Sequence, residues 1–223
     1  MKRIYFLFAG LVLVFSIITP MHATTIAYGD PATTGNEIWT GNLGEDFTAD
    51  SPIEITALGV YNSGQTGTIG GTLEVGIVAS DGTVEVSEIF SGTIGTLIGG
   101  DLFLNLATPI TLAPGDYSLT TTGWGPNILN GNANCAGGGC GVPPPALYTP
   151  PTLNDGGGAL TFTGIGYTST PGLVYLAPVG SYPADEFNAG SFQFTPTPEP
   201  ATLAGVTLGL VAFLALRGRA LKR

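Results

Sequence analysis

The distribution of apolar and polar residues along this chain is typical of a β protein. Between residues 24 and 194, apolar side chains repeatedly occupy every second position, which is the spacing of a strand with one buried face. The alternating segments are 72–79, 84–86, 102–106, 110–112, 117–121, 160–162 and 192–194. No part of this region has helical spacing, so we expect it to consist of strands and turns.

Turn residues separate these segments at short intervals. Asp81-Gly82 predicts a tight hairpin, and 113–116, with sequence APGD, predicts a second turn. Within 53–61 the apolar residues occupy alternate positions, but the alternation shifts by one residue beside Gly59. This shift predicts a β-bulge or a strand that changes sheets. Many short strands joined by such turns predict an all-β fold, an antiparallel β-sandwich or jelly roll over residues 24–194.

Each end of the chain has an apolar run beside positive charge. Lys2 and Arg3 precede the apolar run 4–18, so residues 1–23 are expected to be a signal peptide, with an uncleaved anchor as the alternative. Residues 201–216 carry no charge and, as a helix, would be slightly shorter than a bilayer core. The basic residues that follow are expected to stop transfer and stay on the cytoplasmic side. They are Arg217, Arg219, Lys222 and Arg223.

Pro198, Glu199 and Pro200 stand directly before this second apolar run. The order of motif, apolar segment and basic end resembles the PEP-CTERM sorting signal of exported bacterial proteins. The resemblance implies transient anchoring in the inner membrane and cleavage by an exosortase, a membrane-embedded protease, in bacteria that make exopolysaccharide. Residues 195–223 are therefore expected to form a sorting tail, with an extended spacer at 195–198. A plain C-terminal anchor is the alternative.

A second resemblance concerns residues 38–125. The segments 42–48, 55–61, 106–112 and 115–117 are similar to a β-sandwich domain of unknown function that occurs in PEP-CTERM proteins and other bacterial surface proteins. Residues 126–190 do not align with that domain. It has no established catalytic residues, so the resemblance assigns none to this chain.

The charge distribution excludes several classes of function. The net charge is −10, and residues 24–197 contain every acidic residue except Glu199 but no Lys, Arg or His. Without basic side chains, nucleic-acid binding and phosphate chemistry are not expected. A Ser-His-Asp or Cys-His catalytic group is also excluded. The acids are interpreted as solvated, including the adjacent pairs at 45–46 and 185–186, whose members would point to opposite faces of a strand.

The two cysteines, Cys135 and Cys140, lie in a Gly- and Pro-rich stretch, 127–158, that is expected to be a long loop. Export to an oxidising compartment predicts a local disulfide between them. Free thiols or a metal pair are the alternatives, although a zinc site would need further ligands. No cofactor is expected. Calcium is an alternative, with carboxylates in Gly-rich loops as provisional ligands: Asp46, Asp81, Asp155 and Asp185.

Aromatic side chains outside the core would offer platforms for sugars. Trp124, in a Gly- and Pro-flanked turn, is the best candidate for a glycan contact, and core packing is the alternative. The other candidates are Trp39, Tyr148, Tyr167, Tyr175 and Tyr182.

The sequence thus predicts an exported cell-surface or extracellular protein, structural or adhesive in an exopolysaccharide matrix, and not an enzyme. The alternatives are a carbohydrate-binding module and a secreted glycoside-acting enzyme, which would need two carboxylates at a set separation. The expected partners are an exosortase, the inner membrane transiently, and extracellular polysaccharide.

Overall fold

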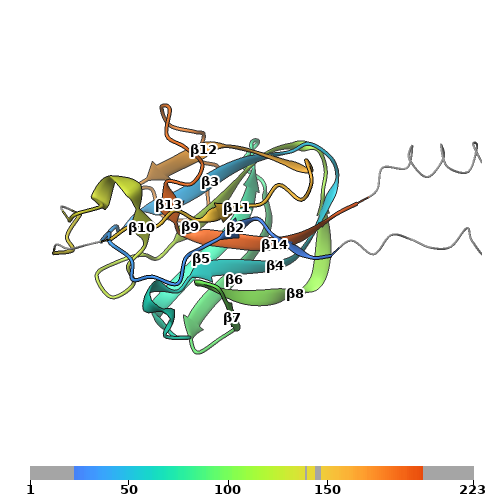
Figure 1. Cartoon of the computed structure of the whole chain (residues 1–223). Helices are drawn as coiled ribbons and strands as arrows, with labels where there is room; N and C mark the ends of the chain where they lie inside the picture. The colour runs from blue at the N-terminus through green and yellow to red at the C-terminus, as the bar shows by residue number, and fades with distance from the viewer. Residues whose placement is uncertain (1–22, 139, 144–146, 198–223) are drawn as a thin grey trace, which may run out of the picture.

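The protein is a sandwich of two five-stranded antiparallel sheets (Figure 1), in a computed structural model that describes residues 23–138, 140–143 and 147–197. The expected antiparallel all-β fold is confirmed. The first sheet has the order β1 (Thr25–Ile26), β14 (Gly190–Pro196), β4 (Ile53–Tyr61), β8 (Asp101–Leu112) and β7 (Thr96–Ile98). The second has the order β12 (Leu160–Thr168), β3 (Asn42–Ala49), β9 (Gly115–Thr122), β5 (Ile69–Ala79) and β6 (Val84–Gly92).

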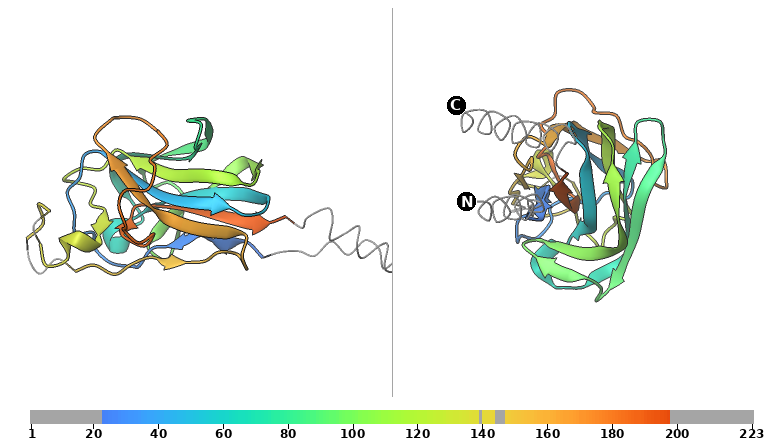
Figure 2. Two further views of the ribbon diagram at one scale, coloured as in Figure 1. Left: turned by 90° about the horizontal axis from the view of Figure 1, so that it is seen from above. Right: turned by 90° about the vertical axis from the view of Figure 1, so that its right-hand side faces the viewer.

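Smaller elements complete the domain. Strand β2 (Tyr28–Gly29) pairs with β11 (Thr152–Leu153), and β10 (Gly131–Asn132) pairs with β13 (Phe187–Asn188). Two short 3-10 turns are present, η2 (Ser63–Gln65) and η3 (Ala133–Cys135). Figure 2 shows how the two large sheets curve around a shared interior. The expected signal peptide, except its last residue, and most of the expected sorting tail, 198–223, lie outside the described residues.

The predicted turns form as their residues require. In the β5–β6 hairpin the Gly82 amide donates to the Ala79 carbonyl at 2.8 Å, and the Ala79 amide donates to the Thr83 carbonyl at 2.8 Å. Gly82 has a φ of 90°, a left-handed conformation that glycine adopts without steric cost. After β8, the Tyr117 hydroxyl donates to the Ala113 carbonyl at 2.8 Å and closes the second turn.

A bulge in β4 explains the change of apolar phase seen in the sequence, but it lies at Thr56 and not at Gly59. Ile55 pairs with Phe194 and Ala57 with Gln193, so Thr56 is an extra residue opposite β14. The extra residue keeps both halves of the strand facing the core. Strand β4 stays within one sheet, so the alternative of a strand that changes sheets is wrong. Glycine is needed at 59 because a Cβ there would lie 2.6 Å from the Phe103 ring.

The last strand of the domain runs further than expected. Thr195 and Pro196 belong to β14 and pair with Glu54 and Ile53, and the Thr197 amide donates to the Pro52 carbonyl at 3.0 Å. Residues 195–197 are therefore extended, as predicted, but they belong to the sheet and are not a spacer. Since Thr25 pairs with Phe194, the first and last described residues leave the sandwich at the same end (Figure 1).

Apolar burial between the sheets forms the core. Its centre is a group of aromatic rings: Phe47 lies 5.0 Å from Phe192 and 5.6 Å from Tyr117, measured between ring centroids. Phe192 in turn lies 5.6 Å from Phe194. These rings come from β3, β9 and β14, so they link the two sheets. Aromatic pairs at such separations add about 1 kcal/mol each beyond the area that they bury.

Several acidic side chains are buried, which corrects the prediction that they are solvated. They are Asp30, Glu37, Glu45, Asp46, Asp101 and Glu186. The prediction that neighbours point to opposite faces holds for the first pair. Glu45 lies between the sheets and accepts from the Gly190 amide at 3.1 Å. Asp46 is on the outer face of the second sheet, where residues 169–182 cover it; the Thr120 hydroxyl on that face donates to the Val174 carbonyl at 2.8 Å.

Burial changes the protonation of these groups, because a charge in the interior loses its hydration. Burial raises the pKa of Asp101 to about 7 and that of Asp46 to about 7. Burial, together with the charge of Asp101, also raises the pKa of Asp30, whose amide donates to Asp101 Oδ2 at 3.1 Å. No Lys, Arg or His in residues 24–197 is present to neutralise any of them. Protonation is therefore the route by which these carboxyls become neutral inside the domain.

The domain should lose stability as the pH rises from 5 to 8. A carboxyl whose pKa is raised on folding stabilises the native state below its unfolded value, here 3.8, and this stabilisation is lost as the pH passes about 7. For Asp101 we expect a loss of roughly 2 kcal/mol in the free energy of unfolding over this range. Melting temperatures measured across the range check this.

Asp101→Asn should reduce the pH dependence, because the amide has no charge to bury. Glu85→Gln, an exposed carboxylate on β6, is the matched control and should leave the pH dependence unchanged. A melting temperature that stays constant or rises between pH 5 and pH 8 would contradict the prediction.

Candidate functional site

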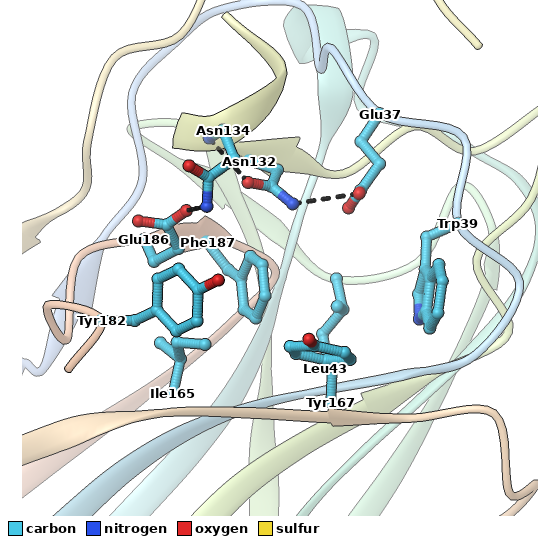
Figure 3. Close-up of a pocket in the computed structure, with 10 residues that line it drawn as sticks. All are labelled: Glu37, Trp39, Leu43, Asn132, Asn134, Ile165, Tyr167, Tyr182, Glu186 and Phe187. Carbon is cyan, nitrogen blue, oxygen red and sulfur yellow. Dashed lines mark hydrogen bonds between the residues drawn. The ribbon is translucent and has the colours of Figure 1, made fainter. Parts of the chain in front are cut away.

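A half-open pocket with a volume of about 140 Å³ lies where β12, β10 and β13 meet (Figure 3). The pocket is at the end of the sandwich opposite to the first and last described residues (Figure 1). Strand β13, which lines it, comes just before the start of β14, whereas Thr197 comes just after the end of β14. The residues that line the pocket are Glu37, Trp39, Leu43, Asn132, Asn134, Ile165, Tyr167, Tyr182, Glu186 and Phe187.

Aromatic side chains form one wall of the pocket. Trp39 and Tyr167 pack edge to face, with ring centroids 6.1 Å apart and an interplanar angle of 87°. Tyr167 is 48% exposed and Tyr182 is 42% exposed, whereas Phe187 lies buried at the base. Aromatic rings that remain accessible beside a pocket offer flat apolar faces to a ligand.

Two asparagines hold two glutamates at the opposite wall. Asn132 Nδ2 donates to Glu37 Oε1 at 3.0 Å, and Asn134 Nδ2 donates to Glu186 Oε1 at 2.5 Å. The asparagines are themselves fixed, because Asn132 Oδ1 caps η3 by accepting from the Asn134 amide at 2.9 Å. The four side chains therefore form a row of ordered polar groups, which Figure 3 shows facing the aromatic rings.

The disulfide between Cys135 and Cys140 lies directly beside this row, and the predicted pairing is confirmed. The Cys140 carbonyl accepts from the Ile38 amide at 2.8 Å, so the disulfide loop is tied to the segment that carries Glu37 and Trp39. This gives the stretch 127–158 a structural role: it contributes two asparagines to the pocket and is tied to the segment that carries Glu37 and Trp39.

Glu37 is one of two buried carboxylates in the lining of the pocket. Only 8% of it is exposed, and its Oε2 forms no hydrogen bond to any described residue. Burial raises the pKa of Glu37, the amides of Asn132 and Asn130 lower it, and the charge of Glu186 raises it. Burial also raises the pKa of Glu186. The carboxylate of Glu37 points into the pocket (Figure 3).

Metal binding finds little support in this arrangement. Glu37, Cys135 and Cys140 place their ligand atoms within 4.8 Å of one another, and this is the one such group in the described part of the chain. The two sulfurs are bonded to each other, however, and a disulfide offers no thiolate to a metal. The aspartates proposed for calcium, Asp46, Asp81, Asp155 and Asp185, are not part of that group.

Only some of the aromatic residues predicted to contact glycans lie in the pocket. Trp124, the favoured glycan contact, is 4% exposed, and its indole N–H donates to Thr121 Oγ1 at 3.2 Å, so its ring belongs to the core. The Tyr148 hydroxyl donates to the Asp185 carbonyl, away from the pocket lining. Trp39, Tyr167 and Tyr182 do line the pocket.

Sequence reasoning missed the polar half of the site. Glu37, Asn132 and Glu186 come from three separate segments, and no spacing between them marks them as neighbours. The one local signal was the pair of asparagines at 132 and 134, directly before the first cysteine.

A second hollow, of about 470 Å³, lies between η2 and residues 126–129. Tyr61 is its only aromatic lining residue and is fully buried, and no charged side chain lines the hollow. The smaller pocket, with exposed rings and ordered polar groups, therefore has more of the features of a binding site.

Comparisons of the chain with protein-family models, with curated proteins and with solved structures found no match. Across residues 23–138, 140–143 and 147–197, no helix has the length and hydrophobicity that crossing a bilayer requires.

The disulfide should form in exported protein and should be needed for an ordered pocket. We expect alkylation without reductant to add no mass to the exported chain, and alkylation after reduction to modify both cysteines. A Cys135→Ser/Cys140→Ser variant should lose affinity for pocket ligands more than global stability, since the bond closes a very short loop. Two alkylated thiols in unreduced exported protein would contradict this prediction.

Proposed function

We propose that this chain is an exported protein of the bacterial cell surface or exopolysaccharide matrix, and that it binds carbohydrate through the pocket. The observation that carries the proposal is the pairing of accessible aromatic rings with an ordered row of amide and carboxylate groups. A structural or adhesive role in the matrix follows from such binding. The signal peptide, sorting tail and exosortase processing remain part of the proposal, on the resemblance described above.

The pocket has the two kinds of surface that a sugar needs. A pyranose ring has apolar C–H faces, which pack on aromatic rings such as Trp39 and Tyr167, and a rim of hydroxyls, which need donors and acceptors. Asn132, Glu37 and Glu186 supply these at the opposite wall. Since hydrogen bonds and the disulfide loop already hold them, little side-chain ordering opposes binding.

The size of the pocket suits one sugar unit of a longer chain. An apolar cavity of about 150 Å³ holds a benzene ring, and this pocket, at about 140 Å³ and open on one side, is of the same order. A terminal residue or a side branch of a polysaccharide would enter, while the rest of the polymer extends into solvent.

The position of the pocket is consistent with display at a surface. The first and last described residues lie together at one end of the sandwich, and the pocket lies at the other. If the segment after Thr197 anchors the chain before processing, the pocket points away from the membrane. The seven residues of β14 alone separate the two ends by roughly 23 Å.

Glycoside hydrolysis is the second candidate, because Glu37 and Glu186 line one pocket and burial raises the pKa of both. Glycosidases use a pair of carboxyl groups, of which the general acid has a raised pKa. Binding without turnover supports the adhesive function, and release of reducing sugar from a bound oligosaccharide supports hydrolysis.

Replacement of Trp39 should remove carbohydrate binding. On an array of bacterial and plant glycans, we expect the full chain to bind a subset and Trp39→Ala to weaken that binding at least about fivefold, since stacking on one aromatic ring contributes about 1 kcal/mol or more. Trp39→Phe should keep part of the affinity. Ile89→Ala, at an exposed apolar residue on β6 outside the pocket, should change nothing. Absence of all glycan binding, or binding that Trp39→Ala leaves intact, would contradict the proposal.

The tail proposal has its own test. If the chain is sorted as the resemblance implies, mass spectrometry of surface material should recover no peptide that ends at Arg223. Glu199→Ala should block processing and leave the chain anchored. Replacing the basic residues of the tail with neutral ones should weaken retention and processing together, because charged side chains resist transfer through hydrocarbon. Intact tail peptides in mature surface protein would indicate a permanent anchor.

A further inference from the structure

The peptide bond between Asp30 and Pro31 is the one Asp-Pro bond in the sequence. Such a bond has a built-in route to cleavage, because the aspartate carboxyl can attack its own backbone carbonyl and close a five-membered anhydride. The proline nitrogen is a tertiary amide and is protonated more easily than other peptide nitrogens, so it leaves more readily. In an exposed chain at neutral pH the aspartate is ionised and holds no proton, and the bond is stable.

In this domain the bond lies beside a buried pair of carboxyl groups. Asp30 is 4% exposed and Asp101 is 1% exposed. Burial raises the pKa of both carboxyls, and the hydrogen bond between their side chains raises the pKa of Asp30 and lowers that of Asp101. A hydrogen bond between two carboxyl groups requires a proton, so the pair holds one next to the Asp-Pro bond.

The surroundings of the pair do not compete for this proton or for the attacking oxygen. No described N–H or O–H group donates to Asp30 Oδ1 or Oδ2, so the carboxyl is not tied down by a hydrogen bond from elsewhere in the domain. The other titratable groups around it are Glu45, Tyr61 and Tyr148, and residues 24–197 supply no positive charge.

The carbonyl that would be attacked is held by a backbone donor. The Gly100 amide donates to the Asp30 carbonyl oxygen at 2.9 Å, and the Gly100 carbonyl accepts from the Asn62 amide at 2.7 Å. Glycine is required at 100, since a Cβ there would lie 2.2 Å from the Pro31 carbonyl oxygen. Negative charge develops on the Asp30 carbonyl oxygen during attack, and a fixed N–H directed at that oxygen stabilises it.

We propose that the folded domain cleaves its own Asp30–Pro31 bond. Asp101 accepts the proton of the Asp30 carboxyl as an Asp30 side-chain oxygen attacks the Asp30 carbonyl carbon. The new C–O bond closes the anhydride, and the C–N bond to Pro31 breaks with its electron pair going to nitrogen. Asp101 returns the proton to that nitrogen, and water then opens the anhydride to give Asp30 two free carboxyls. This activity does not depend on the proposed carbohydrate binding.

The product is a domain of two chains held together by strand pairing. The segment before the cut is fixed on both sides: the Ala27 amide donates to the Phe192 carbonyl at 3.0 Å, and the Asn154 amide donates to the Ala27 carbonyl at 3.0 Å. The Tyr28 side chain is fully buried. Cleavage therefore breaks the covalent link to everything before Pro31 while β1 and β2 stay in place until they are unpaired.

Mass spectrometry of the full chain tests this. The chain is purified in mild detergent with protease inhibitors and incubated at pH 7, once folded and once in concentrated guanidinium chloride. We expect the folded chain to yield a fragment that begins at Pro31, at a rate independent of protein concentration, and at least about a hundredfold faster than the unfolded chain. Hydroxylamine should trap the anhydride as a hydroxamate on Asp30, which separates self-cleavage from a contaminating protease.

Three variants test the chemistry. Asp30→Ala removes the attacking oxygen and Pro31→Ala replaces the leaving group with an ordinary amide, so both should stop cleavage. Asp101→Asn keeps the shape of the second carboxyl and removes its proton transfer, and should slow cleavage about a hundredfold or more. Glu85→Gln makes the equivalent change at an exposed site on β6 and should leave the rate unchanged. Melting curves show that each variant is folded.

The wild-type comparison decides the proposal even if a variant fails to fold. A folded wild-type chain that stays intact, or one that is cleaved no faster than the unfolded chain, would overturn it. Cleavage at Pro31 that persists unchanged in folded Asp101→Asn or Pro31→Ala would also overturn it.

Discussion

The absence of basic side chains from residues 24–197 is the constraint on which the rest of the structure depends. Buried carboxylates in proteins are normally balanced by Lys, Arg or His, and this domain has none to offer. Its six buried acids are stabilised instead by backbone amides, as at Glu45, by asparagine side chains, as at Glu37, or by protonation, as burial favours for Asp101. The same shortage makes the stability of the interior sensitive to pH.

Stability has to come from apolar packing, because this domain cannot form side-chain salt bridges within itself. The aromatic group around Phe47 and Phe192 joins the two sheets, and the bulge at Thr56 keeps β4 facing that group along its whole length. The sandwich in turn provides two fixed ends. One end carries the first and last described residues, and the other carries the disulfide loop and the pocket.

The pocket is assembled by this arrangement and not by any one segment. Strand β12 contributes Tyr167, the segment before β3 contributes Glu37 and Trp39, and the disulfide loop contributes Asn132 and Asn134. The hydrogen bond from the Ile38 amide to the Cys140 carbonyl connects two of these segments directly. A binding site built from tied segments is preorganised, which favours recognition of a flexible polymer because less conformational entropy is lost on binding.

The sequence by itself determined most of the long strands, the turns at 81–82 and 113–116, and the disulfide. Alternation of Leu73, Val75 and Ile77 depends only on which side chains face a core, and the turn at Gly82 depends only on local backbone freedom. The tertiary structure alone decided that Glu45 is buried, that Trp124 is a core residue and that Trp39 is a pocket residue. Residues far apart in sequence meet only through strand order and register, and no local pattern encodes which acid or ring the opposite sheet will cover.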